Sequence, residues 1–160
     1  MVDYFSDPRR RLARAKENIA NLNAGIRAFT SKNPYSNIID VDPQTQNKIH
    51  KVVLTDPIPD ELFDLADEIV EALRSVLDKI GFAAASTLGA TKLNSTYFPI
   101  ADTDDDLKNG VLGRGRCRDL PEDIVQLFLS FNPTKSGNIL IWAINQLANS
   151  ANTAFWPLRE

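Results

Sequence analysis

Two segments of the chain repeat apolar residues at the spacing of an amphipathic helix. In the first, six apolar side chains recur every three or four residues, which places them on one face of a helix. They are Leu12, Ala15, Ile19, Leu22, Ile26 and Phe29. Asp7 as N-cap and Pro8 at the first helical position predict its start, and Pro34 predicts its end. We therefore predict a helix over residues 8–31.

The second segment begins near Asp60 and extends to about Ala85. Its apolar residues follow the same spacing: Leu62, Ala66, Ile69, Leu73, Val76, Leu77 and Ile80. Between the two helices, residues 36–41 and 48–54 are β-branched runs separated by residues with turn chemistry, which predicts a β-hairpin. Because a lone hairpin is only marginally stable, we expect it to pack on the helices.

The last third of the chain predicts shorter helices after an irregular stretch at residues 86–101. A short helix is expected over 103–109, with acidic residues at its start. A second follows a capping box at Asp119 and Glu122. A third, over about 138–150, is apolar on nearly every side and is therefore expected to be central or to lie at an interface.

These elements predict a mainly α fold. It is a bundle of four to five helices with one β-hairpin between the first two long helices, in a single domain over residues 1–160. The residues expected to be buried are Leu12, Ile19, Leu22, Ile26, Leu62, Ile69, Leu73, Leu77, Phe128 and Leu140.

Charge and composition exclude several classes of function. The net charge of -3 gives no general attraction to nucleic acid, so we interpret the basic clusters at Arg9–Lys16 and Arg114–Arg118 as solvated faces. The single cysteine, Cys117, and the single histidine, His50, cannot form a zinc site together, and we expect no metal or cofactor. The sequence has no signal peptide and no apolar run of ~20 residues, which favours a cytoplasmic protein without a membrane partner.

Three segments carry a resemblance to known proteins. The first helix contains the pattern Pro8, Arg9, Arg11, Leu12, Arg14, Ala15, Ile19 and Leu22. The second contains Ala72-Leu-Arg-Ser-Val-Leu-Asp-Lys79, and a later segment includes Trp142 and residues 149–154. With these motifs the chain resembles a largely uncharacterised group of bacterial proteins with HEPN-like helical bundles.

The resemblance implies a chemistry for which this chain lacks the key residues. HEPN ribonucleases pair an arginine with a histidine to cleave RNA beside a 2′-hydroxyl. Here Arg74 is retained, but Lys79 and Thr153 stand where the resemblance implies histidines. A lysine with a pKa of about 10.4 is a poor general base at neutral pH. Arg74 instead fits an ion pair with Asp78 or Glu71.

The candidate catalytic residues are therefore weak ones: Arg74, Asp78 and Lys79. We expect a non-catalytic, degenerate HEPN-like interaction or regulatory domain rather than an enzyme. The alternative is an RNA-binding protein or ribonuclease that uses Arg74 with a non-histidine partner. We also expect a homodimer, because the last helix and the residues Phe155 and Trp156 are strongly apolar.

Overall fold

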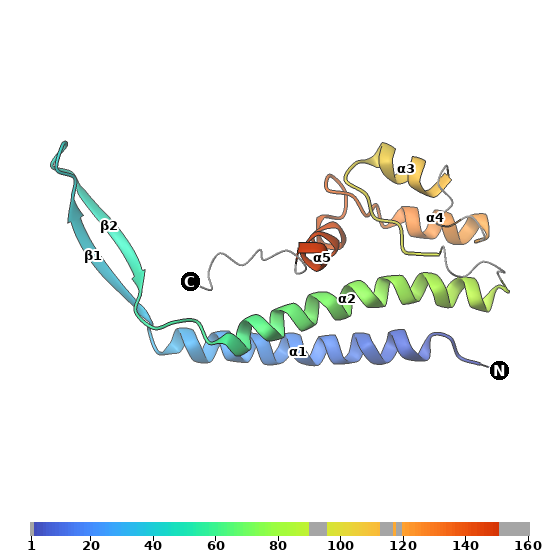
Figure 1. Ribbon diagram of the computed structural model, residues 1–160, viewed down its shortest axis with the longest axis horizontal. Coiled ribbons are helices and arrows are strands. Elements are labelled where there is room, and N and C mark those ends of the chain that lie inside the picture. The colour runs from blue at the N-terminus through green and yellow to red at the C-terminus, as the bar shows by residue number, and fades with distance from the viewer. Residues whose placement is uncertain (1, 90–95, 113–116, 118–119, 151–160) are drawn as a thin grey trace.

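Two long antiparallel helices form the base of the fold. The computed structural model describes residues 2–89, 96–112, 117 and 120–150. Helix α1 (Ser6–Ser31) and helix α2 (Asp60–Thr87) run side by side along most of their length (Figure 1). The predicted architecture, a mainly helical chain with one β-hairpin between its first two helices, is confirmed.

Small and polar residues let α1 approach α2 closely. Ala15 is fully buried in α1. A Cβ atom on Gly25 would lie 2.5 Å from Cδ2 of Leu62, so glycine leaves room for this leucine. About two helical turns away, Asn18 Nδ2 donates a hydrogen bond to Glu68 Oε2 at 3.0 Å. These contacts fix the register between the two helices.

The hairpin extends from one end of the helix pair. Strands β1 (Tyr35–Val41) and β2 (Lys48–Leu54) are antiparallel, with Tyr35 opposite Leu54. Figure 1 shows the strands leading away from the helices, so the expectation that they pack on the helices is wrong. The physical reason is that the connections between the hairpin and the helices are short and stiff. At the base of the hairpin, Thr55 N donates a hydrogen bond to Pro34 O at 2.8 Å, and prolines, which restrict the backbone, follow.

Both faces of the hairpin expose large apolar side chains. The exposed ones are Tyr35, Ile38, Ile39, Val41, Ile49, Val52, Val53 and Leu54. Val52 is the most exposed of them, at 70%. A two-stranded hairpin is marginal without a packing surface, so these side chains form an apolar surface that the described part of the chain leaves open.

The remaining helices gather over the C-terminal half of α2 (Figure 1). They are α3 (Asp104–Leu112), α4 (Glu122–Ser130) and α5 (Ile139–Ser150). The main core lies among them and is formed by Ala85, Phe98, Ile100, Leu107, Cys117, Leu120, Val125 and Phe128. The rings of Phe98 and Phe128 are in contact, tilted by 46° with their centroids 5.1 Å apart.

Four of the ten residues expected to be buried are exposed. Leu12, Ile19 and Ile26 on α1 are 36%, 38% and 44% exposed, whereas Ala15 and Phe29 on the same helix are buried. Leu140 is 74% exposed, because α5 turns Ile141 and Trp142 rather than Leu140 toward the core. Among the rest, Ile69 and Phe128 are buried, while Leu22, Leu62, Leu73 and Leu77 are half-buried.

Two predicted helix starts are also wrong. Helix α1 begins at Ser6 with Phe5 as its N-cap, so Asp7 lies within the first turn. Helix α4 follows Pro121 as N-cap, without a side-chain cap. In both cases the N-cap residue has no side-chain group that could accept a hydrogen bond, so no polar side chain caps the helix.

Candidate functional site

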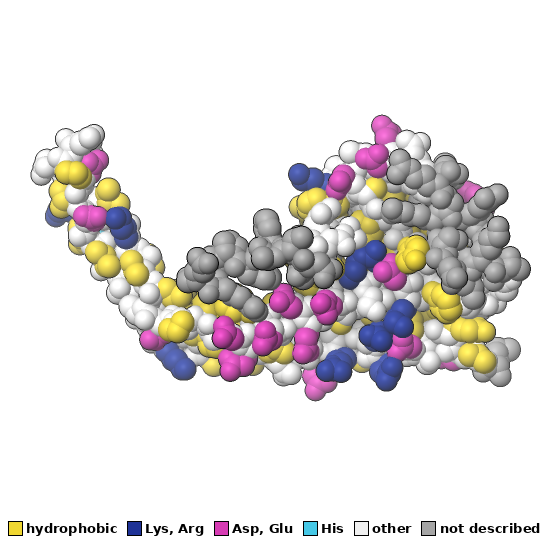
Figure 2. Space-filling model, in the orientation of Figure 1, with side chains coloured by type: hydrophobic (Ala, Val, Ile, Leu, Met, Phe, Trp, Pro, Cys, Tyr) yellow, Lys and Arg dark blue, Asp and Glu magenta, His cyan; other side chains and the backbone are white. Residues whose placement is uncertain are grey.

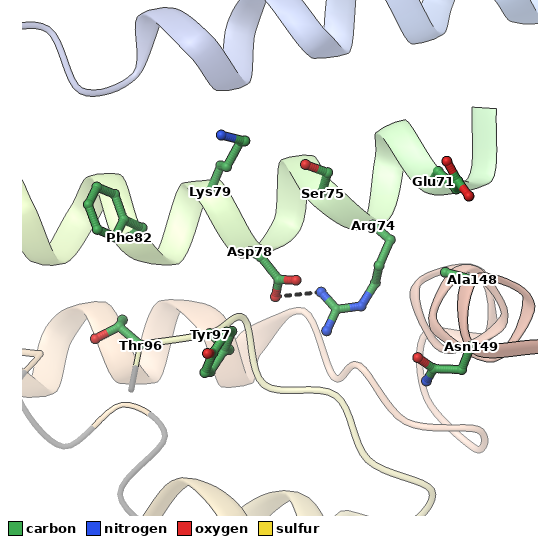
Figure 3. Close-up of a pocket in the computed structure, with 10 residues that line it drawn as sticks. All are labelled: Glu71, Arg74, Ser75, Asp78, Lys79, Phe82, Thr96, Tyr97, Ala148 and Asn149. Atoms are coloured by element: carbon green, nitrogen blue, oxygen red, sulfur yellow. Dashed lines mark ion pairs between the residues drawn. The ribbon is translucent and has the colours of Figure 1, made fainter. Parts of the chain in front are cut away.

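Arg74 lies in the middle of α2 and lines a cleft between α2, α5 and the segment that precedes Phe98. The cleft has a volume of about 820 Å³. Figure 3 shows the side chains around it. They are Glu71, Arg74, Ser75, Asp78, Lys79, Phe82, Thr96, Tyr97, Ala148 and Asn149.

The guanidinium of Arg74 is held by two neighbours. Its Nε donates a hydrogen bond to Oδ1 of Asn145 on α5, at 2.9 Å. Its Nη1 lies 2.5 Å from Asp78 Oδ1, four residues along the same helix. Both of these atoms are buried and neither makes a hydrogen bond, so an ion pair joins them. Asp78 is thus the carboxylate that pairs with Arg74, and Asn145 ties the pair to α5.

Lys79 points to the other side of α2. Figure 3 shows its side chain directed toward α1, whereas Arg74 and Asp78 point into the cleft. The ammonium Nζ lies 2.6 Å from Asp7 Oδ2. Five residues separate Arg74 from Lys79, which corresponds to ~140° around a helix. The two candidate residues therefore do not converge on one point in the cleft.

Asp7 gathers three cations at the start of α1. Besides Lys79, its carboxylate binds Arg10 at 2.7 Å and Arg11 at 3.2 Å. The hydrogen bond from Lys79, followed by that from Arg10, holds the pKa of Asp7 well below its ordinary value of 3.8. The ion pair of Lys79 with Asp7 connects α2 to α1. Acidic residues near the start of the chain also neutralise part of the positive charge of the basic cluster there.

Histidine is the side chain that most often exchanges protons near neutral pH. The chain's one histidine, His50, lies on β2 opposite Ile39, in the hairpin that extends beyond the helix pair. Cys117 is buried, with Sγ 3.7 Å from the carbonyl oxygen of Tyr97. Among the side chains that line the cleft, none is an imidazole. A general acid or base usually raises the rate of a reaction that requires proton transfer by about 10²–10⁴-fold.

The structure also adds residues that the sequence did not single out. Asn145 anchors Arg74, and Tyr97 and Asn149 line the cleft. In the sequence, Asn145 could have been noticed only as a polar residue within a helix that is otherwise strongly apolar. Thr96 and Tyr97 belong to an irregular segment without a pattern, so only the folded chain brings them to the cleft.

Other sequence predictions lie outside the described residues. These concern Arg114, Arg116 and Arg118, the segment that includes Thr153, and the pair Phe155 and Trp156. Among the residues that the structure does describe, no group of three or more His, Cys, Asp and Glu side chains is placed to hold a metal ion.

The described helices are also too short or too polar to cross a membrane. Comparisons of the chain with models of known protein families, with curated proteins and with solved structures found no match.

Proposed function

We propose that this chain is a non-catalytic, HEPN-like protein that acts through contacts with other protein surfaces. In this proposal it forms a homodimer in the bacterial cytoplasm. The observation that carries the proposal is the arrangement of Arg74 and Lys79, which point to opposite sides of α2 and bind different carboxylates.

The pairing of these residues supports a structural role for both. Lys79 joins α2 to α1 through Asp7, and Arg74 joins α2 to α5 through Asn145. A general base must reach the proton that it removes, and an ammonium bound to a carboxylate has no free electron pair for this step. The motif therefore supports the packing of α2 rather than proton transfer.

The hairpin supports a function in protein contacts. Its eight exposed apolar side chains lie on both faces of two strands whose outer edges are unpaired within the described chain. Large exposed apolar patches usually mark interaction sites, and unpaired strand edges readily accept a further strand. Figure 2 shows apolar side chains along this projection, interrupted by few charges.

The cleft supports a second candidate, an RNA-binding protein. Tyr97 is 48% exposed at the cleft, and an exposed aromatic ring is a surface on which a base can stack. Arg74 lies in the same cleft and would supply the positive charge, although Asp78 already partly neutralises it. In this alternative a non-histidine group would act with Arg74.

Light scattering with and without RNA separates the two candidates. Our proposal predicts a protein mass of twice the 17.8 kDa chain, unchanged when single-stranded RNA is added. An RNA complex that disappears in both Arg74→Ala and Tyr97→Ala would overturn it in favour of RNA binding. The control variant is Asn21→Ala, on an exposed part of α1 distant from the cleft residues in sequence.

A further inference from the structure

Strand β1 presents an unpaired edge along its whole length in the described part of the chain. At the two ends of the hairpin, Thr55 N donates to Pro34 O at 2.8 Å and Asp42 N donates to Asn47 O at 3.0 Å. These two pairs continue the register of the strands by one residue at each end. Because hydrogen-bonded and non-hydrogen-bonded pairs alternate along an antiparallel ladder, the even-numbered residues of β1 bond to β2. The backbone groups of the odd-numbered residues therefore point outward, at Tyr35, Asn37, Ile39 and Val41.

The edge of β1 is open to a further strand, whereas the edge of β2 is guarded. Strand β1 contains neither proline nor lysine. Strand β2 carries Lys48 and Lys51, and lysines on an edge strand oppose pairing with another chain. Figure 1 shows β1 on the outer side of the hairpin and β2 on the side toward α5. Of the outward N–H groups of β1, that of Val41 is bound by Asp40 Oδ1 at 2.9 Å, and the others have no partner within the described chain.

A second copy of β1 fits this edge in antiparallel register. A two-fold axis at Ile38, the middle residue of β1, pairs all 7 residues of the strand. It joins the outward backbone groups of Asn37 to those of Ile39 in the second copy. On the side chains, Ile38 lies against Ile38 and Ser36 lies against Asp40, so no like charges are directly opposite. An interface between two identical surfaces has this self-complementary form.

The other ways of joining two hairpins by their edges fit less well. The equivalent axis on β2 lies at its middle residue and places Lys51 against Lys51 of the second copy. Each lysine has one carboxylate partner in the described chain, Asp40 of its own copy, and directly opposite like charges destabilise a strand pair. Pairing of β1 with β2 of the second copy leaves a free edge at both ends and continues into a chain of molecules. The pair of β1 strands alone closes at two copies without opposing like charges.

Pairing at β1 would also give the hairpin the packing that it lacks within one copy. A two-stranded hairpin is marginally stable, whereas a sheet of three or more strands with an apolar face can be stable. Residues directly opposite each other in paired strands share a face of the sheet. One face of this hairpin carries five exposed apolar side chains: Tyr35, Ile39, Val41, Val52 and Leu54. The two-fold axis would place this face of both hairpins on the same side of one four-stranded sheet.

We propose that strand β1 pairs with β1 of a second copy of this chain, antiparallel about a two-fold axis at Ile38. This inference rests on the proposed function in protein contacts and specifies the surface that the homodimer uses. The sheet has the order β2–β1–β1–β2, and the backbone groups of Asn37 and Ile39 form its central hydrogen bonds.

A pair of proline substitutions tests which edge is used. Asn37 and Val52 lie directly opposite each other in the hairpin, and the backbone N–H of each points outward. Asn37→Pro removes an N–H from the β1 edge without removing a hydrogen bond of the hairpin. It should raise the dimer dissociation constant at least about tenfold, equivalent to ~1.4 kcal/mol. Val52→Pro, the matched control, makes the same change at the β2 edge and should leave the constant unchanged. Light scattering over a range of concentrations measures both.

A charged substitution gives a second test that keeps every backbone N–H. Ile38→Arg would place two cations against each other at the axis and should also weaken the dimer at least about tenfold. Val53→Arg adds the same charge to the same face of the hairpin on β2 and should not. Circular dichroism shows whether each variant keeps its helices and strands.

Disulfide formation tests the register. Under mild oxidation Ile38→Cys should form a disulfide between copies, because opposite residues of a non-hydrogen-bonded pair have the closest Cβ atoms. Lys51→Cys, on the same face of β2, should not. The native Cys117 is buried and serves as the background in both. Efficient cross-linking of Lys51→Cys in place of Ile38→Cys would mean that the β2 edges meet and would overturn the proposal.

Failure of this inference differs from failure of the proposed function. A dimer that persists in both Asn37→Pro and Ile38→Arg, while Leu140→Glu in α5 dissociates it, would overturn the β1 interface and leave the homodimer intact. A folded monomer at every concentration would overturn both and leave the β1 edge to a strand of another protein. Cleavage of RNA by an intact dimer would overturn the non-catalytic function and leave the interface standing.

Discussion

Lys79 Nζ lies 2.6 Å from Asp7 Oδ2 and so binds the middle of α2 to the first turn of α1. The HEPN-like relationship that we propose implies a histidine at this position. The chain instead has Lys79, whose longer side chain reaches across to the neighbouring helix. Its partner in the motif, Arg74, points the other way and binds Asp78 and Asn145. The two residues therefore stabilise two different helix contacts.

The first prediction concerns the pH dependence of stability. The pKa of Asp7 is lower in the folded chain than its ordinary value of 3.8, chiefly because of Lys79. A lowered folded pKa gives stability that is present above the unfolded pKa and is lost as pH falls through the folded pKa. Asp7→Asn should therefore be less stable than the unmodified chain between about pH 5 and 7, and this difference should shrink below pH 3.8.

Urea unfolding at a series of pH values measures this difference. Glu17→Gln serves as the control, because it removes one exposed carboxylate from the same helix. If the difference for Asp7→Asn stays constant down to pH 2, or matches that of Glu17→Gln throughout, Asp7 does not link the two helices as described.

The second prediction concerns the anchor of Arg74 on α5. Arg74→Ala leaves Asp78 and Asn145 without this partner and should cost about 1–3 kcal/mol of unfolding free energy. In a double-mutant cycle with Asn145→Ala, the coupling should be about 0.5–1.5 kcal/mol, as expected for one hydrogen bond. Additive effects of the two substitutions would mean that this contact does not hold α5 on α2.

The third prediction separates two residues that the sequence placed in the core together. Phe128 is 3% exposed and its ring packs against that of Phe98, so Phe128→Ala should cost about 3–5 kcal/mol. Leu140 is largely exposed on α5, and Leu140→Ala should change stability by less than about 0.5 kcal/mol. Chemical unfolding measures both, and similar losses would show that α5 packs in another orientation.

The pattern of apolar residues predicted the long helices and the hairpin because these elements repeat over many residues. Periodicity identifies a face of a helix, but it does not say what covers that face. The stripe on α1 contains both Ala15, which is fully buried, and Ile19, which is exposed. Helix α2 covers only part of so wide a stripe, and the sequence alone does not show which residues of the stripe are covered.

The candidate site was predictable only where its residues share one helix. The spacing of Arg74 and Asp78 by four residues indicated their ion pair. The partners from elsewhere, Asp7 and Asn145, depend on how α1 and α5 pack on α2. Lys79 and Asp7 are 72 positions apart in the sequence, and Asn145 and Arg74 are 71 positions apart. No local pattern encodes them.

RNA cleavage by the purified chain tests the central claim, that Lys79 and Arg74 are structural residues rather than a catalytic pair. The chain should cleave a broad set of single-stranded RNA substrates no faster than a protein-free blank at pH 7, because none of the described side chains that line the cleft is an imidazole and Lys79 is bound to Asp7. Lys79→His, which restores the histidine implied by the resemblance, is measured beside it. Cleavage by the unmodified chain that Arg74→Ala abolishes, while Asn21→Ala retains it, would contradict the account.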